Sequence, residues 1–312
     1  MDYFPAYDVI MEISDPNDSY TLNATFAEDI DYGVTHIITS TIYFLICAIG
    51  LISNALALYV ALRYVKLGKA TNIFIFNLVI GDLLVMFGLL FTAFQQVMFY
   101  WPFDSFLCKI VMMMDFINPL AGIFFIMIMS IGHCVAVYFP EKSSVCQRLE
   151  VAKVLALITW LVAFFFVLPV ITFADANGFN QCTIVWPEPG ITWDATYTIT
   201  IFALGFCLPV WVSVVSFLIL LVKPKDVDLS ADASTCRGTE GTKLVVALCV
   251  VFILCWLPLN LLSIFDLTVN LPTALVRVYD FFVILTYAKS CIYPILYKCL
   301  SDDFRKGFQR VL

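Results

Sequence analysis

The sequence has few charged residues and very little histidine. Only 13% of its 312 residues are charged, and two are His. Soluble domains carry about 25% charged residues, so the composition argues against a water-soluble enzyme. The formal net charge of −7 argues against nucleic-acid binding. The eleven Cys form no C-x-x-C pair, and no phosphate-binding loop, G-x-G-x-x-G or H-E-x-x-H motif occurs. We therefore expect no cofactor, no metal site and no catalysis.

Long apolar runs fill most of the chain instead. Hydrophobic residues make up 62% of it. A transmembrane helix needs about 20 mainly apolar residues. Continuous rather than alternating runs favour helices over membrane strands. The fold expected is an all-α membrane protein, a seven-transmembrane helix bundle. The seven predicted spans are Ile37–Leu62, Asn72–Phe99, Phe106–Tyr138, Val151–Phe173, Ala195–Val222, Lys243–Leu267 and Leu275–Cys299.

The positions of Lys and Arg predict how the bundle lies in the membrane, because cytoplasmic loops carry an excess of both. The first 36 residues hold eight acids and no Lys or Arg, whereas each loop on the other side and the C-terminal end carry Lys and Arg. We therefore expect a multi-pass plasma-membrane protein with an acidic extracellular segment over 1–36, a bundle over 37–299 and a cytoplasmic tail over 300–312. Asn17 and Asn23 lie in Asn-x-Ser/Thr sequons, and we expect both to be glycosylated.

The segment after the seventh span predicts a short amphipathic helix. Phe304 and Phe308 lie four residues apart, with Arg305 and Lys306 on the other side. Such a helix lies on the inner leaflet with its apolar face toward lipid, so membrane lipid is an expected partner. Ser301 is the expected cap at its start.

Ionisable side chains at membrane depth are expensive to bury and indicate function. Asp82, Asp115, Asp280 and Lys289 occupy such positions. Asp115 lies about two turns inside the third span, where it either meets a cation, such as a ligand ammonium, or stays neutral and hydrogen-bonded. Asp280 is close enough to the outer end of its span to be wetted. Asp82 and Lys289 are both deep, and each can partner the other.

Two cysteines fall on the predicted outer side. Cys108 begins the third span and Cys182 lies in the second outer loop. An oxidising space favours a disulfide between them, and free thiols at both positions are the alternative. Prolines inside spans also predict kinks in the helices that hold them. These prolines are Pro169, Pro209, Pro258 and Pro294.

Together these motifs make the chain resemble rhodopsin-like G-protein-coupled receptors along nearly its whole length. The residues that carry the resemblance are Asn54, Asn77-Leu78-x-x-x-Asp82, Trp101-Pro102-Phe103, Cys108, Trp160, Pro209, Cys255-Trp256-Leu257-Pro258 and Pro294-x-x-Tyr297. Within that family the chain is most similar to somatostatin receptors and their opioid and allatostatin-C relatives. The strings behind this narrower match include Met113-Met114-Asp115-x-Ile117-Asn118, Cys182-Thr183-Ile184-x-Trp186-Pro187 and Leu285-Thr286-Tyr287-Ala288.

The resemblance implies a receptor for an extracellular peptide that signals through an inhibitory heterotrimeric G-protein. In the family, a carboxylate at the position of Asp115 pairs with a basic side chain of the peptide. The ligand site implied here comprises Asp115, Asn118, Trp256 and Asp280. The resemblance implies that the peptide is basic and cyclic, and the acidic N-terminal segment would steer such a peptide toward this site.

The departures from the family concern the signalling machinery. The Asp-Arg-Tyr at the inner end of the third helix reads Gly132-His133-Cys134, and the Asn-Pro-x-x-Tyr of the seventh reads Tyr293-Pro294-Ile295-Leu296-Tyr297. His133 lacks the guanidinium fork of Arg. The implied positions for activation and G-protein contact are Gly132, His133, Cys134, Pro294 and Tyr297.

An internal polar network is expected at Asp82, Lys289, Ser290 and Tyr293. In family members the positions of Asp82, Asn118 and Ser290 help to hold a sodium ion, and these three residues remain here. Our hypothesis is that the Lys289 ammonium replaces that ion, because two isolated buried charges would each cost several kcal/mol.

Two functions therefore stay open at this point. One is a peptide receptor that couples to inhibitory G-proteins, and the other is a divergent receptor that acts as a decoy or modulator without coupling. A transporter or channel is a remote third, because neither an internal repeat nor broken spans are visible.

Overall fold

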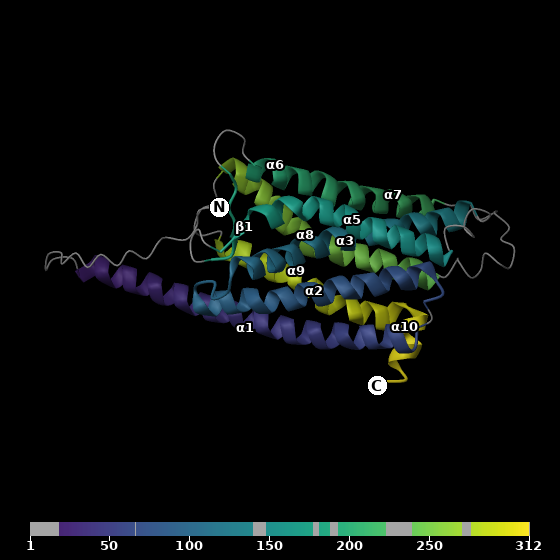
Figure 1. Ribbon diagram of the computed structural model, residues 1–312, viewed down its shortest axis with the longest axis horizontal. Coiled ribbons are helices and arrows are strands. Elements are labelled where there is room, and N and C mark those ends of the chain that lie inside the picture. The colour runs from purple at the N-terminus through teal and green to yellow at the C-terminus, as the bar shows by residue number, and fades with distance from the viewer. Residues whose placement is uncertain are drawn as a thin grey trace.

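The computed structural model describes residues 19–65, 67–139, 148–176, 181–187, 193–222, 239–269 and 276–311. Its long helices run side by side along the longest axis (Figure 1). A short antiparallel strand pair, β1 (Ala174–Asp175) and β2 (Thr183–Ile184), lies at one end of the bundle. The short helix α10 (Asp302–Phe308) lies at the other end. These are called the strand end and the α10 end below.

The described helices coincide with the seven predicted spans. When α6, η1 and α7 are counted as one helix, six of the described helices are long and apolar enough to cross a membrane. The seventh, α9, is interrupted by Asp280 and Lys289. Helix ends differ from the predicted ends by at most four residues, except at the start of α1. The helices are α1 (Ser19–Arg63), α2 (Ala70–Met98), α3 (Ser105–Tyr138), α5 (Leu149–Phe173), α6 (Trp193–Thr200), η1 (Ile201–Cys207), α7 (Leu208–Leu221), α8 (Thr239–Val269) and α9 (Val276–Leu300).

Helix α1 begins at Ser19 rather than at the predicted Ile37. The added segment contains no Pro and only one Gly, Gly33. Extending a helix that is already nucleated adds one hydrogen bond per residue, so the segment continues the transmembrane helix. The predicted domain boundary at residue 36 therefore falls inside α1. Asn17 lies outside the described residues, and the side chain of Asn23 does as well.

A π-helical segment interrupts the fifth span. Residues Ile201–Cys207 form η1, and the N–H of Leu208 donates to the Ala203 carbonyl. Pro209 follows directly at the start of α7. Proline has no N–H to donate, and a wider turn before it accommodates the missing hydrogen bond. Pro209 therefore marks the junction between two helical forms rather than the middle of one helix.

Helix α10 packs on the bundle. Phe304 and Phe308 are 0% and 3% exposed, and the Phe304 ring lies 5.7 Å from that of Tyr297. Gly307 permits close contact with α1, because a Cβ there would lie 2.5 Å from Cγ1 of Val60. The bundle therefore covers the two aromatic rings of the predicted amphipathic helix, and the location of this helix on the inner leaflet stays a prediction. Ser301 is the N-cap residue, but its hydroxyl makes no capping hydrogen bond.

Candidate functional site

A disulfide ties the strand pair to the bundle. Cys108, near the start of α3, bonds to Cys182, which immediately precedes β2. The predicted bridge is therefore confirmed. The N–H of Cys182 donates to Gln95 Oε1 of α2 at 3.0 Å. The Ser105 hydroxyl donates to Asp175 Oδ1 of β1 at 2.7 Å. These contacts hold the strands against α2 and α3 above the centre of the bundle.

Asp115 lies on α3, further into the bundle than Cys108. Its Oδ1 is buried and has no hydrogen-bond partner among the described residues. Tyr287 of α9 interacts with the carboxyl group. Gly88 of α2 lies next to it, and a Cβ there would make an ordinary contact of 3.4 Å with Oδ1. A buried acceptor without a donor is costly, so a cationic ligand group is favoured at this oxygen.

Aromatic side chains connect the neighbourhood of Asp115 to the strand end. The ring of Phe116 lies 6.4 Å from that of Tyr197 on α6. Tyr197 lies 5.3 Å from Trp186, and Trp186 lies 5.6 Å from Phe173 at the end of α5. These rings join α3, α5, α6 and the segment after β2 into one aromatic wall, which begins on α3 one residue after Asp115.

Trp256 and Asp280 lie apart from that wall. The Trp256 ring stacks on Phe252 at 6.1 Å, and Phe252 stacks on Phe206 of η1 at 6.0 Å. Its Nε1 is buried without a hydrogen-bond partner among the described residues. Asp280 is half-buried on α9 and faces His36 of α1. No contact between described residues joins either side chain directly to Asp115, so a ligand would have to bridge them.

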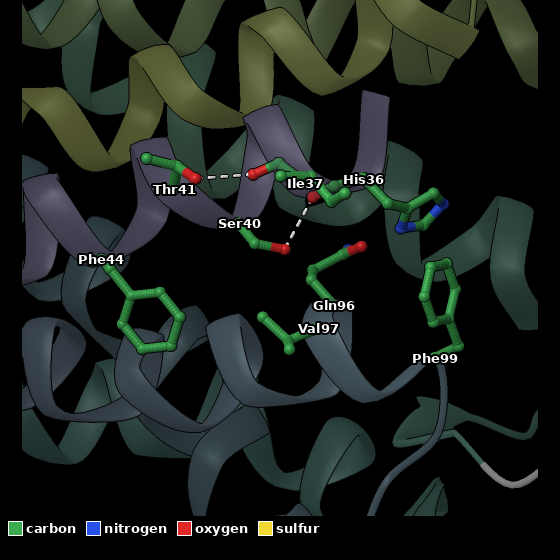
Figure 2. A pocket seen from close by; sticks show the side chains of 8 residues that line it. All are labelled: His36, Ile37, Ser40, Thr41, Phe44, Gln96, Val97 and Phe99. Atoms are coloured by element: carbon green, nitrogen blue, oxygen red, sulfur yellow. Dashed lines mark hydrogen bonds between the residues drawn. The ribbon is translucent and has the colours of Figure 1, made fainter. Parts of the chain in front are cut away.

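A small cavity opens between the strand-end portions of α1 and α2 (Figure 2). Its volume is about 220 Å³, and none of its lining residues belongs to the ligand site expected from the sequence. Figure 2 shows the rings of His36 and Phe99 at one side, with centroids 4.9 Å apart. The remaining lining residues are Ile37, Ser40, Thr41, Phe44, Gln96 and Val97.

Deeper in the bundle, the structure brings the predicted polar network together. Asp82 of α2 and Lys289 of α9 are each 1% exposed, and Lys289 Nζ lies 3.2 Å from Asp82 Oδ1. The Ser290 hydroxyl donates to the same oxygen at 2.7 Å. Asn118 Nδ2 donates to it from α3 at 3.4 Å. The predicted pairing of Lys289 with Asp82 is confirmed, and Asn118 lies in this cluster rather than beside Asp115.

Tyr293 takes part in the network through its ring. Lys289 Nζ lies 4.8 Å from the centroid of that ring, a favourable cation–π arrangement. The phenol donates instead to the Leu248 carbonyl of α8 at 3.2 Å. Asn54 Nδ2 of α1 donates to the Ser290 carbonyl at 2.8 Å. The cluster thereby links α1, α2, α3, α8 and α9.

Lys289, Ser290 and Asn118 all contact Oδ1 of Asp82, whereas Oδ2 of the same carboxylate is buried without a hydrogen-bond partner among the described residues. The Lys289 ammonium already neutralises the carboxylate and donates to its Oδ1. An added cation would face the like charge of that ammonium inside a low-dielectric bundle. The Tyr293 ring fills the other side of Nζ.

At the α10 end, His133 packs against α8. A Cβ on Gly241 would lie 3.2 Å from Cε1 of this imidazole. A Cβ on the preceding Gly132 would meet no atom within 4 Å. Tyr297 is fully buried and its hydroxyl has no partner among the described residues. Pro294 is buried and Cys134 is a partly buried free thiol.

Sequence reasoning missed several of these contacts. Tyr287 was quoted only as part of the motif Leu285-Thr286-Tyr287-Ala288, with no role at the ligand site. Its interaction with Asp115 depends on how α3 and α9 are rotated relative to each other, which residue spacing does not predict. The stacking of Phe206 on Phe252 depends on the π-helical turn of η1. The small glycines Gly88 and Gly241 were the available signals, because a glycine inside a membrane helix often marks a close approach.

Comparison with known proteins agrees with this arrangement. The family described as 7 transmembrane receptor (rhodopsin family) matches residues 53–297. Somatostatin receptor type 5 of Rattus norvegicus is 39% identical over 286 residues, which cover 90% of this chain and 79% of that protein. Somatostatin receptor type 2 of Mus musculus is 40% identical over 279 residues, covering 87% and 76%. Somatostatin receptor type 3 of Homo sapiens is 37% identical over 287 residues, covering 89% and 69%.

These matches extend through all the helices that build the internal cluster and the surroundings of Asp115. The members of this family are receptors and not enzymes. The chain therefore belongs to the rhodopsin family of seven-transmembrane G-protein-coupled receptors and is a multi-pass membrane protein of somatostatin-receptor type.

Proposed function

We propose that this receptor binds a basic peptide through Asp115 and signals through inhibitory G-proteins. The observation that carries the proposal is the buried Oδ1 of Asp115, which accepts no hydrogen bond from the described residues. The aromatic wall beside it would contact the apolar side chains of the peptide. The similar proteins are named for somatostatin, which makes a somatostatin-like cyclic peptide the first ligand to test.

The orientation of the bundle belongs to the same proposal. The strand end faces outward, so that the acidic N-terminal segment and the disulfide meet the extracellular space. Asn17 and Asn23 would then carry glycans. Treatment of surface-labelled receptor with a glycosidase should increase its mobility on a gel. The Asn17→Gln/Asn23→Gln receptor should already show the higher mobility.

The test of the ligand site is peptide-evoked G-protein dissociation in cells, with surface expression measured in parallel. Asp115→Asn should abolish the response, since an amide cannot neutralise a basic side chain. Asp194→Asn is the matched control, because it makes the same substitution on α6 at the strand end and leaves Asp115 intact. Tyr287→Phe tests the alternative of a neutral Asp115 held by the phenol. If that reading were right, binding would survive Asp115→Asn.

A second candidate function is supported by the α10 end of the bundle. His133 stands where the family has Arg, and its ring packs on Gly241 of α8. A neutral imidazole in this contact offers a G-protein neither the charge nor the reach of a guanidinium. We therefore also consider a receptor that binds peptide without ordinary coupling.

One rescue experiment separates the two candidates. The triple variant Gly132→Asp/His133→Arg/Cys134→Tyr restores the family motif, and the open space around Gly132 accommodates the new carboxylate. Binding without response in the parent, and a response in the variant, would identify a silenced receptor. A full response in the parent would identify a coupling receptor that works with His133.

The Lys289 ammonium also acts, in this proposal, as a tethered replacement for sodium. Peptide binding by the parent should then be independent of sodium. Lys289→Ala leaves Asp82 without its counter-charge and should make binding sodium-sensitive. A sodium-sensitive parent would contradict the replacement.

A further inference from the structure

A proline interrupts the hydrogen bonding of α3 one turn after Asp115. Pro119 lies inside this helix, four residues further along the chain. In an α-helix the N–H of each residue donates to the carbonyl oxygen four residues earlier, and proline has no N–H. The main-chain carbonyl oxygen of Asp115 therefore lacks the hydrogen bond that the helix would otherwise supply.

Other helices do not replace the missing donor. Within the part of the chain that the structure describes, no group from another element donates to the main-chain oxygen of Asp115. Oδ1 of the same residue is buried and has no hydrogen-bond partner there either. Asp115 therefore presents two acceptors without donors, one on its carboxyl group and one on its main chain.

A second proline shows how this bundle treats such a carbonyl. Pro294 lies inside α9, and the carbonyl that it leaves without a helical donor belongs to Ser290, four residues earlier. Asn54 Nδ2 of α1 donates to that oxygen at 2.8 Å. An unpaired buried acceptor is costly, so a donor from another helix supplies the missing bond. At Asp115, a ligand can supply the corresponding bond.

The face of α3 that carries these acceptors is directed into the bundle. Residues four apart share one face of a helix, and the Asp115 carboxyl lies next to Gly88 of α2 and interacts with Tyr287 of α9. Asp115 and Pro119 are both partly exposed, whereas Asn118, which directly precedes the proline, is buried. The neighbouring helices therefore do not seal this face against a ligand.

Two acceptors on one residue favour a ligand group with several N–H donors. Helical side chains tilt toward the N-terminal end of the helix, whereas carbonyl oxygens point toward its C-terminal end. A group that enters from the strand end therefore meets Oδ1 of Asp115 first and the main-chain oxygen next. A primary ammonium has three donors and can satisfy both oxygens. A tertiary ammonium carries the same charge but has a single donor, so it satisfies only one of them.

We propose that Pro119 makes the main-chain carbonyl of Asp115 a second contact for the ligand, which selects a primary ammonium such as that of a lysine side chain. The assignment rests on the proposed function, because it requires the peptide to place its basic group at Asp115. Oδ1 binds the charge, and the main-chain oxygen accepts a second N–H from the same ammonium. Pro119 is a positioning residue, since it acts by leaving this carbonyl free.

Binding of two cyclic peptides to the full-length receptor provides the test. Both peptides are somatostatin-like and carry one basic side chain, either lysine or N,N-dimethyl-lysine, which keeps the charge but has a single N–H. Pro119→Ala restores the main-chain N–H, which then occupies the carbonyl of Asp115. Lactic acid at position 119 has the methyl side chain of alanine but an ester oxygen in place of the N–H, so it leaves the carbonyl free.

The matched control is Pro169→Ala. It makes the same substitution inside α5, where the carbonyl concerned belongs to the exposed Phe165 rather than to the ligand site. Alanine is the best helix former and proline the worst, so both alanine variants keep their helices.

The parent should bind the lysine peptide about ten-fold more tightly than the dimethyl-lysine peptide, which corresponds to the lower end of the range for a hydrogen bond to a charged group. Pro119→Ala should bind the lysine peptide about ten-fold more weakly than the parent does and should bind the two peptides equally. The receptor with lactic acid at position 119 and the Pro169→Ala receptor should both behave as the parent.

Two results would overturn the role of Pro119 alone. Equal binding of the lysine peptide by the alanine and lactic acid receptors would show that the main-chain carbonyl makes no contact with the ligand. A loss in Pro119→Ala that both peptides share would assign the effect to the shape of α3. In either case, lost binding in Asp115→Asn would leave the proposed function standing.

A different pair of results would overturn the proposed function and the role of Pro119 with it. One is an Asp115→Asn receptor that binds both peptides as tightly as the parent. The other is a parent that reaches the cell surface and binds neither peptide.

Discussion

Removing the Lys289 ammonium should destabilise the receptor, and removing its partner charge as well should restore it. Breaking a buried ion pair from one side costs about 3–5 kcal/mol, because the remaining charge is left uncompensated. Both side chains are 1% exposed here, so water does not screen the charge that stays behind. Ser290 and Asn118 still donate to Asp82 after the change. We therefore expect Lys289→Met to cost about 3 kcal/mol, at the lower end of that range.

Thermal unfolding with a thiol-reactive dye measures this cost directly. Cys47, Cys249 and Cys255 are buried free thiols that react only after unfolding. At about 2 °C per kcal/mol for a chain of this size, Lys289→Met should lower Tm by roughly 6 °C. The measurement is made without sodium, so that no added cation occupies the space next to Asp82.

The double variant Asp82→Asn/Lys289→Met supplies the decisive comparison. It retains polar contacts to Ser290 and buries no net charge, so its Tm should lie within about 2 °C of the parent. Asp82→Asn alone should lower Tm almost as far as Lys289→Met, since it leaves the buried ammonium without a counter-charge. A double variant whose loss equals the sum of the two single losses would refute a coupled ion pair.

Three further predictions concern other parts of the molecule. Gly307→Ala places a Cβ 2.5 Å from Cγ1 of Val60, so it should lower Tm by about 2–6 °C. Gly88→Ala is the control, because its Cβ makes an ordinary contact of 3.4 Å, and it should change Tm little in the same dye assay. Cys108→Ser removes a disulfide that stabilises the folded receptor by about 2–4 kcal/mol. Surface expression of this variant, measured by flow cytometry, should therefore fall below that of the parent. Treating the parent with dithiothreitol should reduce its peptide binding to the level of the variant. Burial raises the pKa of Asp303, but hydrogen bonds from Lys69 at 2.8 Å and from Asn72 outweigh it and lower that pKa in the folded state. The stabilising contribution of Asp303 is therefore complete above its unfolded pKa and is lost as pH falls through the folded pKa. The Tm difference between parent and Asp303→Asn should stay constant from neutral pH to about pH 5 and shrink below about pH 4. A difference that grew on acidification would contradict the pairing with Lys69.

The family and the membrane spans could be predicted from the sequence because both depend on local patterns. Apolar length alone predicts the spans, and helix ends agree with it to within four residues after α1. The pairing of Asp82 with Lys289 was also predictable, since a buried charge needs a counter-charge and few are available at that depth. The disulfide followed from the topology, which puts Cys108 and Cys182 on one side of the membrane.

Other features depended on contacts between helices. The resemblance implied two positions for Asn118, in the ligand site and beside Asp82, and the rotation of α3 directs its amide to Asp82. The pattern of Phe304 and Phe308 correctly predicted an amphipathic helix but not whether lipid or protein covers its apolar face. Periodicity defines a face of a helix, and only packing decides what that face touches.

By itself, the sequence determined where the membrane helices run, which end of the bundle is basic, and which charges need partners. Apolar length, local helix geometry and the cost of burying charge act over short distances along the chain. The tertiary structure alone decided that Asp115 keeps an unpaired oxygen beside Gly88 and that His133 packs on Gly241. It also paired Lys69 with Asp303, which lie 234 residues apart in the chain. Such contacts depend on the rotation and separation of whole helices, which packing across the bundle sets and no single segment encodes.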